Sequence, residues 1–387
     1  MNTFMKRITT LALSAIMLVG VLAGCQSSAA DASGTSASAA QNPTTVTVEH
    51  ALGTTEVPFA PTRVFVLDLA ALDTIDALGL GEYVVGVQEF RNIPTYLSAY
   101  YDDDAIVVLP TAYTGHGDDD DDDDTTSDLA AAYNSVDADL IIGGSRQVDD
   151  YELLSELAPT IIMLGSDDDD ETSASMDLLD LTSSEATTIA SIWGQDTEVE
   201  AILADYESRI DALKEAISGK SGIIAAPNSR VGGITLSTTD SDSLLTELGF
   251  INLGDTAPED LGGIQALTSK SRQSSETTDT EDAGTETTST GGGGGTTSLD
   301  ADVVAEALKA ITDWIEEQNP AYLLIYDTLY TSLDEAAEAD AEYPGVRDLT
   351  VYKDGNTFFL SSLATTKGGL TFAENQIAEL EKVFLGK

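Results

Sequence analysis

Basic side chains are scarce in this sequence of 387 residues. It holds 17 lysines and arginines against 68 aspartates and glutamates, which gives a formal net charge of −51 at pH 7. A surface of this charge repels nucleic acid and anionic lipid headgroups, and we exclude both as partners. The same acidity would suit a high-salt environment, where salt screens the repulsion between carboxylates, and the alternative is a compositional habit of the lineage.

Cysteine and histidine are nearly absent as well, with one Cys and two His in the chain. A single cysteine excludes an internal disulfide. The sequence contains no Gly-x-Ser-x-Gly and no His-Glu-x-x-His, and neither His50 nor His116 stands near a candidate nucleophile. Carboxylates are too numerous for one pair to stand out as catalytic, so we expect no enzymatic activity.

The amino-terminal segment has the pattern of an export signal. Lys6 and Arg7 precede an apolar run that ends in Leu22-Ala23-Gly24-Cys25. Because this run is shorter than the roughly 20 residues that span a bilayer, it indicates a signal peptide over residues 1–24.

The tetrapeptide Leu-Ala-Gly-Cys resembles the lipobox of bacterial lipoproteins. This resemblance implies cleavage before Cys25, lipidation of its thiol and an extracytoplasmic protein anchored to a cell membrane, which we expect to be that of a single-membrane bacterium. The alternative is an ordinary signal peptide with a chance cysteine. Residues 25–43 are mostly Ser, Ala, Gly and Thr and are predicted to form a flexible tether.

Apolar runs of strand length alternate with helical patterns from Thr44 onward. Such alternation predicts parallel sheets covered by helices. A helix with a 3.6-residue apolar rhythm is expected from Thr197 to Ser218, ended by Gly219. The predicted fold is therefore α/β, with two α/β lobes joined by one long helix. The predicted boundaries are 44–196 for the first lobe, 197–219 for the inter-lobe helix and 220–387 for the second lobe.

Three segments are expected to be disordered loops: 118–124, seven consecutive aspartates; 167–170, four more; and 269–298, composed largely of Thr, Ser, Glu, Asp and Gly. Carboxylate oxygens are ligands for Ca²⁺, but the spacing and glycine of an EF-hand loop are missing from the aspartate runs. Solvated charge is therefore the preferred interpretation over Ca²⁺ binding.

Several short pieces, in order along the chain, resemble iron-siderophore substrate-binding lipoproteins of ABC transporters, most closely the subgroup for ferric catecholate-type siderophores. They are Thr45-Val46-Thr47-Val48-Glu49-His50, Pro61-Thr62-Arg63-Val64, Asp137-Ala138-Asp139-Leu140, Gly144-Ser145-Arg146-Gln147, Asn319-Pro320-Ala321-Tyr322 and Gly368-Gly369-Leu370-Thr371. The resemblance implies a class III periplasmic-binding-protein-like fold with the ligand in the cleft between the lobes. It further implies a monomer that captures a ferric siderophore and delivers it to an ABC permease and its ATPase. No cofactor is expected, since iron enters only within the bound chelate.

Ligand-binding residues are implied by the same resemblance. Arg146 stands where the family places an arginine that contacts the ligand, and cations suit an anionic ferric chelate. The alternative is a surface arginine that neutralises Asp149 and Asp150. Arg91 and Lys367 are candidate substitutes for other family arginines, and Tyr330 is a candidate cleft residue.

Other parts of the family pattern are changed. The second-lobe loop that usually carries Gly-Ser-Arg reads Thr238-Thr239-Asp240-Ser241-Asp242, and the strand before Asp327 is followed by Thr328 where an arginine is usual. With fewer arginines, we expect a less anionic chelate, such as a hydroxamate or mixed-ligand siderophore, rather than a tri-catecholate.

Family members dock on their permease through one acidic residue on each lobe. Asp313 and Asp128 lie at or near the two positions, with ordinary solvated acids as the alternative. Two other interpretations keep the fold: a binding protein for haem, cobalamin or another metal chelate, and a chain whose ligand site has degenerated.

Overall fold

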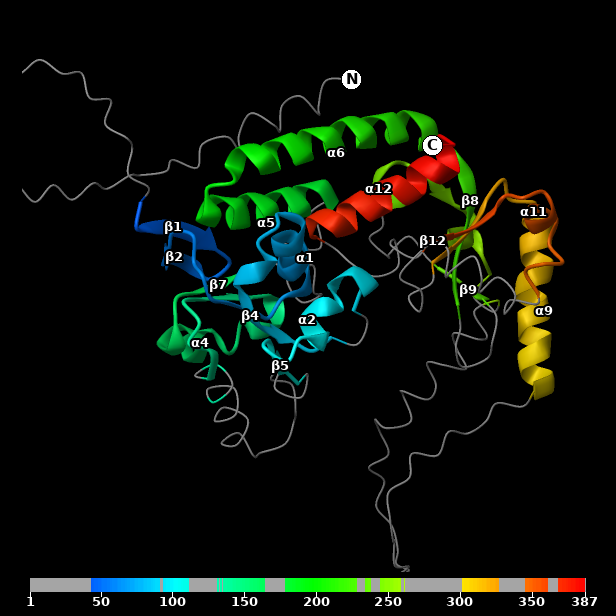
Figure 1. Ribbon diagram of the computed structural model, residues 1–387. Helices are drawn as coiled ribbons and strands as arrows, with labels where there is room; N and C mark the ends of the chain where they lie inside the picture. The colour runs from blue at the N-terminus through cyan, green and yellow to red at the C-terminus, as the bar shows by residue number, and fades with distance from the viewer. Residues whose placement is uncertain are drawn as a thin grey trace, which may run out of the picture. The chain divides into compact units, whose positions relative to one another are not determined.

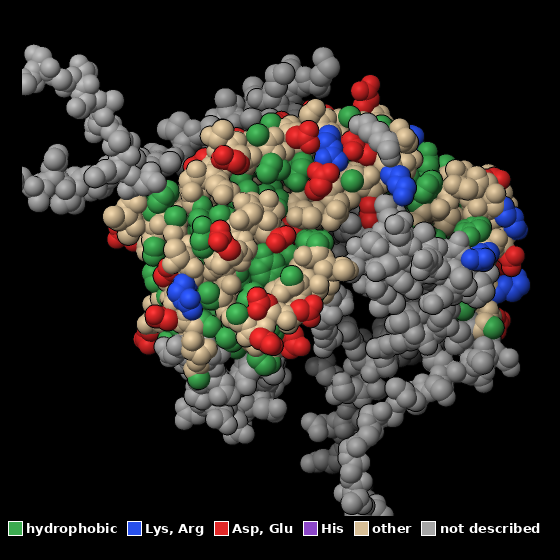
Figure 2. Space-filling model, in the orientation of Figure 1, with side chains coloured by type: hydrophobic (Ala, Val, Ile, Leu, Met, Phe, Trp, Pro, Cys, Tyr) green, Lys and Arg blue, Asp and Glu red, His purple; other side chains and the backbone are tan. Residues whose placement is uncertain are grey.

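The computed structural model describes residues 43–90, 93–110, 131, 133, 135–163, 178–227, 234–237, 244–258, 261, 301–326, 345–360 and 368–386. The described elements all belong to one compact unit, Pro43–Lys387. Figure 1 shows sheets with helices packed around them. Figure 2 shows that acidic side chains are scattered over the face in view, whereas basic ones are few.

An antiparallel hairpin opens the described chain. Strand β1 (Thr45–His50) pairs with β2 (Gly53–Pro58), from Thr45 opposite Pro58 to His50 opposite Gly53. Gly53 has a φ of 137°, a backbone conformation that residues with a Cβ rarely adopt. Val48 and Val57 are buried, and the apolar and polar residues around them alternate as expected for a half-buried hairpin.

The first sheet is parallel, in the order β5-β4-β3-β6-β7. Its strands are β3 (Val64–Val66), β4 (Val84–Gln88), β5 (Val107–Leu109), β6 (Leu140–Gly143) and β7 (Thr160–Ile162). The helical elements around it are α1 (Leu69–Ala77), η2 (Gly81–Tyr83), η3 (Thr95–Leu97), α2 (Ala99–Asp102), η5 (Ser145–Gln147) and α4 (Tyr151–Leu157). A parallel sheet with helices around it is what the alternation of apolar runs and helical patterns predicted.

Two helices come next in the sequence, α5 (Leu178–Trp193) and α6 (Asp196–Ile217). Helix α6 is the predicted long helix, and it packs on α5. The sequence analysis missed α5. Its buried apolar residues at both ends are separated by a polar stretch that includes Thr182 and Glu185, both themselves buried, so its apolar rhythm is interrupted.

The second sheet has the order β10-β8-β11-β12, with β9 paired to β8. Its strands are β8 (Ser221–Pro227), β9 (Ile234–Leu236), β10 (Ile251–Asn252), β11 (Leu323–Tyr326) and β12 (Thr357–Leu360). Strand β9 runs antiparallel to β8, unlike the others. Only six residues separate the two strands, and a parallel crossover needs about a dozen or more.

The helical elements of the second half are α7 (Leu244–Glu247), η7 (Leu253–Thr256), α9 (Ala301–Gln318), α11 (Thr350–Lys353) and α12 (Leu370–Phe384). Helix α12 packs on α6, α1 and α5. One apolar core joins its buried residues to those of α5, α6, β8 and β11. Elements of both predicted lobes thus share this core, and the predicted lobe boundaries stay a prediction.

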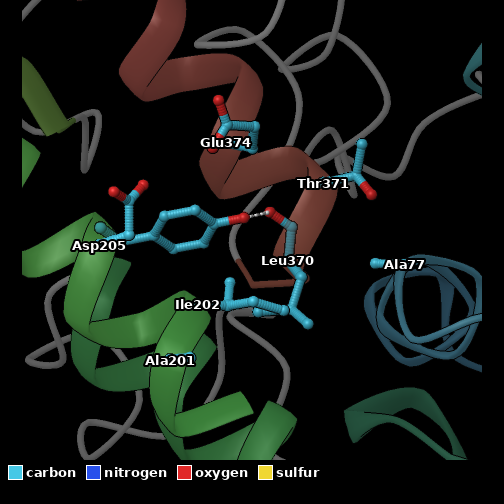
Figure 3. A pocket seen from close by; sticks show the side chains of 8 residues that line it. Ala77, Ala201, Ile202, Asp205, Leu370, Thr371 and Glu374 are labelled. Carbon is cyan, nitrogen blue, oxygen red and sulfur yellow. Dashed lines mark hydrogen bonds between the residues drawn. The ribbon is translucent and has the colours of Figure 1, made fainter. Parts of the chain in front are cut away.

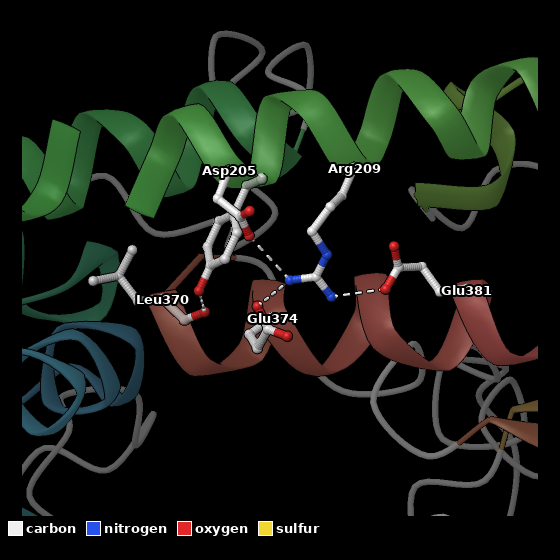
Figure 4. A network of polar contacts seen from close by, with 6 residues as sticks. Asp205, Arg209, Leu370, Glu374 and Glu381 are labelled. Carbon is white, nitrogen blue, oxygen red and sulfur yellow. Dashed lines mark hydrogen bonds and ion pairs between the residues drawn. The ribbon is translucent and has the colours of Figure 1, made fainter. Parts of the chain in front are cut away.

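Polar contacts reinforce the packing of α12 on α6. The Tyr206 hydroxyl donates to the Leu370 carbonyl at 2.9 Å, and Arg209 pairs with Glu374 and Glu381 (Figure 4). Because Arg209 is only 19% exposed, these pairs are partly shielded from solvent. Among the residues that the structure describes, no helix combines the length and the apolar character needed to cross a membrane.

Candidate functional site

The carboxyl ends of the parallel strands in the first sheet form one edge, where open α/β sheets bind their ligands. Leu67 and Asp68 follow β3, Gln88 ends β4, and the stretch 144–147 follows β6. The backbone pairing continues to this edge, with hydrogen bonds from Leu67 N to Ile142 O and from Met163 N to Gly143 O, each 2.7 Å long. The edge is therefore a rigid platform for the side chains that it carries.

Arg146 lies in the one-turn element η5, directly beyond β6, and its side chain is exposed. A side chain on either of the two glycines at the end of β6 would force a neighbouring side chain to shift. A Cβ on Gly143 would lie 2.9 Å from Ile162 Cδ1, and one on Gly144 would lie 2.3 Å from Asp68 Oδ2. The Gly-Gly pair thus lets the backbone turn close against the sheet, and Arg146 is presented just beyond it.

Asp68 has a second role at the same edge. Its Oδ1 accepts a hydrogen bond from Ala71 N at 2.8 Å and caps α1. The capping carboxylate is the group that lies against Gly144. The start of α1 and the turn that carries Arg146 are therefore packed together.

A buried group of carboxyls lies between α1, α5 and the start of α12. Asp73 contacts the first turn of α12, and Glu185 of α5 lies close to Gly368, where a Cβ would come within 2.8 Å of Glu185 Oε2. Burial raises the pKa of Glu185 well above its ordinary value, and the charges of Asp68 and Asp73 raise it further. No described group donates a hydrogen bond to Glu185 Oε1. Both effects favour the neutral form of the Glu185 carboxyl.

A hollow of about 520 Å³ lies on the helices, bordered by Ala77 of α1, by Ile202 and Tyr206 of α6, and by Leu370 and Thr371 of α12 (Figure 3). Asp205 and Glu374 also border it, and both are paired with Arg209. Arg146, the one predicted ligand-binding residue that the structure describes, is not among the residues that line this hollow. It is a feature of the helix packing, separate from the strand-end edge.

The structure describes two of the predicted site residues. Arg146 lies just beyond the carboxyl end of β6, and Asp313 lies exposed on α9, where it pairs with Lys309. Arg91, Lys367, Tyr330, Asp128 and Cys25 lie outside the described residues, as do His116, both aspartate runs and the segment 269–298. Their roles stay predictions.

Both ring nitrogens of His50 contact nearby groups of the hairpin and of β7. Its Nδ1 accepts from Leu52 N at 3.3 Å and from Ile162 N at 3.4 Å, while Nε2 lies 2.9 Å from Thr55 Oγ1. Burial lowers its pKa. With both ring nitrogens engaged, His50 has no nitrogen to offer as an axial haem ligand. Within the described ranges, no group of three His, Cys, Asp or Glu side chains is arranged to hold a metal ion.

Sequence reasoning missed four buried polar side chains near this edge or beside α12: Asp73, Glu185, Gln88 and Gln147. The available signal was a polar residue at a position where the apolar pattern predicts a core residue. That signal is weak in a chain with so many acids.

Two named proteins are similar in sequence to this chain. The chain is 30% identical over 228 residues to the petrobactin-binding protein YclQ of Bacillus subtilis, a match that covers 58% of this chain and 63% of that protein. It is 31% identical over 216 residues to the putative ABC transporter substrate-binding lipoprotein YhfQ of the same organism, covering 55% of this chain and 57% of the relative. The sequence matches thus span less than two thirds of either relative. No family model matches the chain.

Among solved structures, the periplasmic catecholate-siderophore binding protein VctP of Vibrio cholerae superposes with a TM-score of 0.54 at 21% identity, over 87% of this chain and 99% of VctP. At this identity the likeness establishes the fold. The predicted α/β fold of periplasmic-binding-protein type is confirmed, and so is the resemblance to siderophore-binding proteins of ABC transporters that the sequence motifs indicated.

Proposed function

We propose that this chain is the substrate-binding component of an iron-siderophore ABC importer. It captures a ferric chelate at the strand-end edge that carries Arg146 and delivers it to a membrane permease driven by an ATPase. The observation that carries the proposal is the exposed Arg146, placed by Gly143 and Gly144 at the carboxyl end of β6. The relatives named for petrobactin binding and for ABC substrate binding add to it.

The chemistry of this edge suits an anionic or polar chelate. The guanidinium of Arg146 presents several N–H donors in one plane, which match the oxygen atoms around a chelated ferric ion. Among the described residues that directly follow the strands of the first sheet, Arg146 is the basic one. The sequence lacks arginines at several positions where the family usually has them, so we propose a chelate less anionic than a tri-catecholate.

The proposal includes the location and partners of the chain. It would be an extracytoplasmic lipoprotein held to the membrane through Cys25, monomeric, without catalytic activity and without a resident cofactor. Asp313 is exposed and would meet a basic residue of the permease. That contact would compete with the pairing of Asp313 to Lys309. Because both residues are exposed, that pairing is weak.

Tryptophan fluorescence tests the proposal. The full chain, in detergent, would be titrated with a ferric tris-hydroxamate, ferric petrobactin and a ferric tris-catecholate, with the iron-free chelators as controls. Trp193 and Trp314 report binding because ferric chelates absorb light in the range of tryptophan emission. Saturable quenching by one class of chelate is expected. No saturable quenching by any of them would instead favour a chain that keeps the fold but has lost its ligand.

A further inference from the structure

Two buried glutamines are bonded to each other at the strand-end edge. Gln147 of η5 is 3% exposed and Gln88, the last residue of β4, is 0% exposed. Gln147 Nε2 donates to Gln88 Oε1 at 2.9 Å, and Gln147 Oε1 accepts from Gly144 N, also at 2.9 Å. The side chain of Gln147 thus forms a hydrogen bond to the start of the η5 turn and another to the end of β4.

The hydrogen bond between Gln147 and Gln88 crosses the end of β3, which contributes no atom to it. In the sheet order, β4 and β6 are not neighbours but flank β3. The backbone hydrogen bonds of the sheet cannot connect the ends of β4 and β6 directly. The amide bridge between Gln88 and Gln147 does so, and it fixes where the turn after β6 lies relative to β4.

This bridge is costly, which argues that it does more than fill space. Burying two amides removes their hydrogen bonds with water. In the described structure the nitrogen Gln88 Nε2 has no hydrogen-bond partner that replaces the water it loses. Methionine would occupy a similar volume without that cost. What methionine cannot supply is a directional contact that holds the turn.

Arg146 lies between the two anchored positions. On one side, Gly144 is held by Gln147 Oε1 and by its close approach to Asp68, and on the other side Gln147 itself is fixed to Gln88. The backbone of Arg146 is therefore fixed while its side chain remains exposed. A long, flexible side chain meets a ligand with less loss of entropy when its backbone is already in place.

We propose that Gln147 and Gln88 are positioning residues for Arg146, and that their amide bridge holds the η5 turn so that the guanidinium meets the ferric chelate. This inference rests on the proposed function and adds to it two side chains that do not themselves touch the ligand. It predicts that either glutamine affects binding only through Arg146.

A double-mutant cycle tests the inference, with the full chain and ferric petrobactin as the probe, or whichever chelate of the fluorescence panel the wild-type chain binds. Gln147→Met is expected to weaken binding about tenfold when Arg146 is present, the loss of one well-placed charged hydrogen bond. In the Arg146→Ala background the same change is expected to alter affinity less than about twofold, since the interaction it supports is gone. Gln88→Met should reproduce both results, and the two glutamine changes together should cost no more than either alone.

Gln376→Met provides the matched control, because Gln376 is also a buried glutamine but lies on α12. It should lower stability and leave affinity unchanged. Equal losses of affinity from Gln147→Met in both backgrounds would overturn the inference, since the glutamine would then act independently of Arg146. So would an unchanged affinity in the Gln147→Met chain.

Hydrogen exchange separates this inference from the proposed function. The amide of Gly144, which donates to Gln147 Oε1, should exchange at least about tenfold faster in the Gln147→Met chain, while Ile141 within β6 stays protected. If the wild-type chain binds no chelate, the proposed function fails and the role assigned to Arg146 fails with it. If the wild-type chain binds a chelate but the Gly144 amide exchanges at the same rate in the Gln147→Met chain, the positioning role of the glutamines is contradicted. The proposed function would then still hold.

Discussion

Asp73 Oδ2 accepts a hydrogen bond of 2.7 Å from the backbone N–H of Thr371, a residue 298 positions further along the chain. The N–H of Phe372 points to the same oxygen at 3.4 Å, and the Tyr96 hydroxyl donates to Oδ1 at 2.6 Å. A carboxylate of α1 therefore serves as the cap of α12, where the unpaired N–H groups and the helix dipole favour negative charge. The cap links the first predicted lobe to the last helix of the chain.

The cap should be measurable as stability. Asp73→Ala is expected to lower the free energy of unfolding by about 1–3 kcal/mol, because it removes the acceptor for the first turn of α12. Urea unfolding monitored by circular dichroism would give the difference. Asp211→Ala, an exposed change on α6, is the control and should be nearly neutral. Equal effects of the two changes would contradict a capping role for Asp73.

The cap should also make stability depend on pH. Burial raises the pKa of Asp73 to about 6 from an ordinary 3.8, although the hydrogen bonds from Tyr96, Thr371 and Phe372 oppose the rise. A raised carboxyl pKa means that the folded state binds a proton that the unfolded state has released. Stability from this group is then fully present below about pH 4 and is lost as pH rises through about 6.

Asp73→Asn isolates this contribution, because asparagine keeps an accepting oxygen but does not titrate. Relative to the variant, the wild-type chain should lose about 2.5 kcal/mol of stability between pH 4 and pH 7.5, which is most of the roughly 3 kcal/mol that corresponds to the full pKa difference. Both chains should carry Glu185→Gln, because the charge of Asp73 raises the pKa of Glu185 and that group would otherwise titrate differently in the two chains. Tyr96 and Tyr206, whose pKa values are raised, stay protonated across this range. A stability difference that does not change with pH would contradict the titration of Asp73.

Gly369 is expected to tolerate no side chain, for two separate reasons. Its φ is +87°, and a Cβ there would lie 2.6 Å from Asp73 Oδ2. Gly355 has a similar φ of +76° but nothing within 4 Å of a Cβ. Gly355→Ala should therefore cost about 1 kcal/mol from backbone strain alone, and Gly369→Ala should cost at least about twice as much, because it also displaces the cap. Thermal unfolding of both variants checks this, and equal losses would show that Asp73 does not constrain Gly369.

Glu185 should be a place where the chain can gain stability. Its carboxyl is buried beside Asp68 and Asp73, and no described group donates to Oε1. Since its pKa is raised, the folded state disfavours ionisation and the cost grows with pH. Glu185→Gln is expected to stabilise the chain more at pH 8 than at pH 5, as measured by urea unfolding at both values. A variant that is less stable at pH 8 would mean that the ionised carboxyl has a stabilising partner.

The sequence predicted most of the strands and long helices because the spacing of their apolar residues is visible along the chain itself. Helix α5 was missed because Thr182 and Glu185 interrupt that rhythm while being buried, and only tertiary packing explains them. Gly368-Gly369 was recognisable as a motif, but the reason for it, close contact with Glu185 and Asp73, depends on residues far away in the sequence.

The candidate site was predictable in part, through the family resemblance. Gly144-Ser145-Arg146-Gln147 is one of the motifs that carry the resemblance, and Arg146 lies just beyond the carboxyl end of β6. Gln147 and Gln88 could not be selected, because a glutamine that bonds across a sheet looks like any surface glutamine in the sequence. Arg91, Lys367, Tyr330 and Asp128 lie outside the described residues and stay predictions.

The most direct test of the proposed function is a fluorescence titration of wild-type and Arg146→Ala chains with the panel of ferric siderophores. We predict saturable quenching of the wild-type chain by a ferric hydroxamate or by ferric petrobactin, and about tenfold or more weaker binding by Arg146→Ala, which removes a charge-assisted contact. Arg347→Ala, on the segment before α11, is the control for a general loss of positive charge and should bind as the wild type does. Absence of saturable quenching with every chelate, or equal affinity of the wild-type and Arg146→Ala chains, would contradict the account of this site.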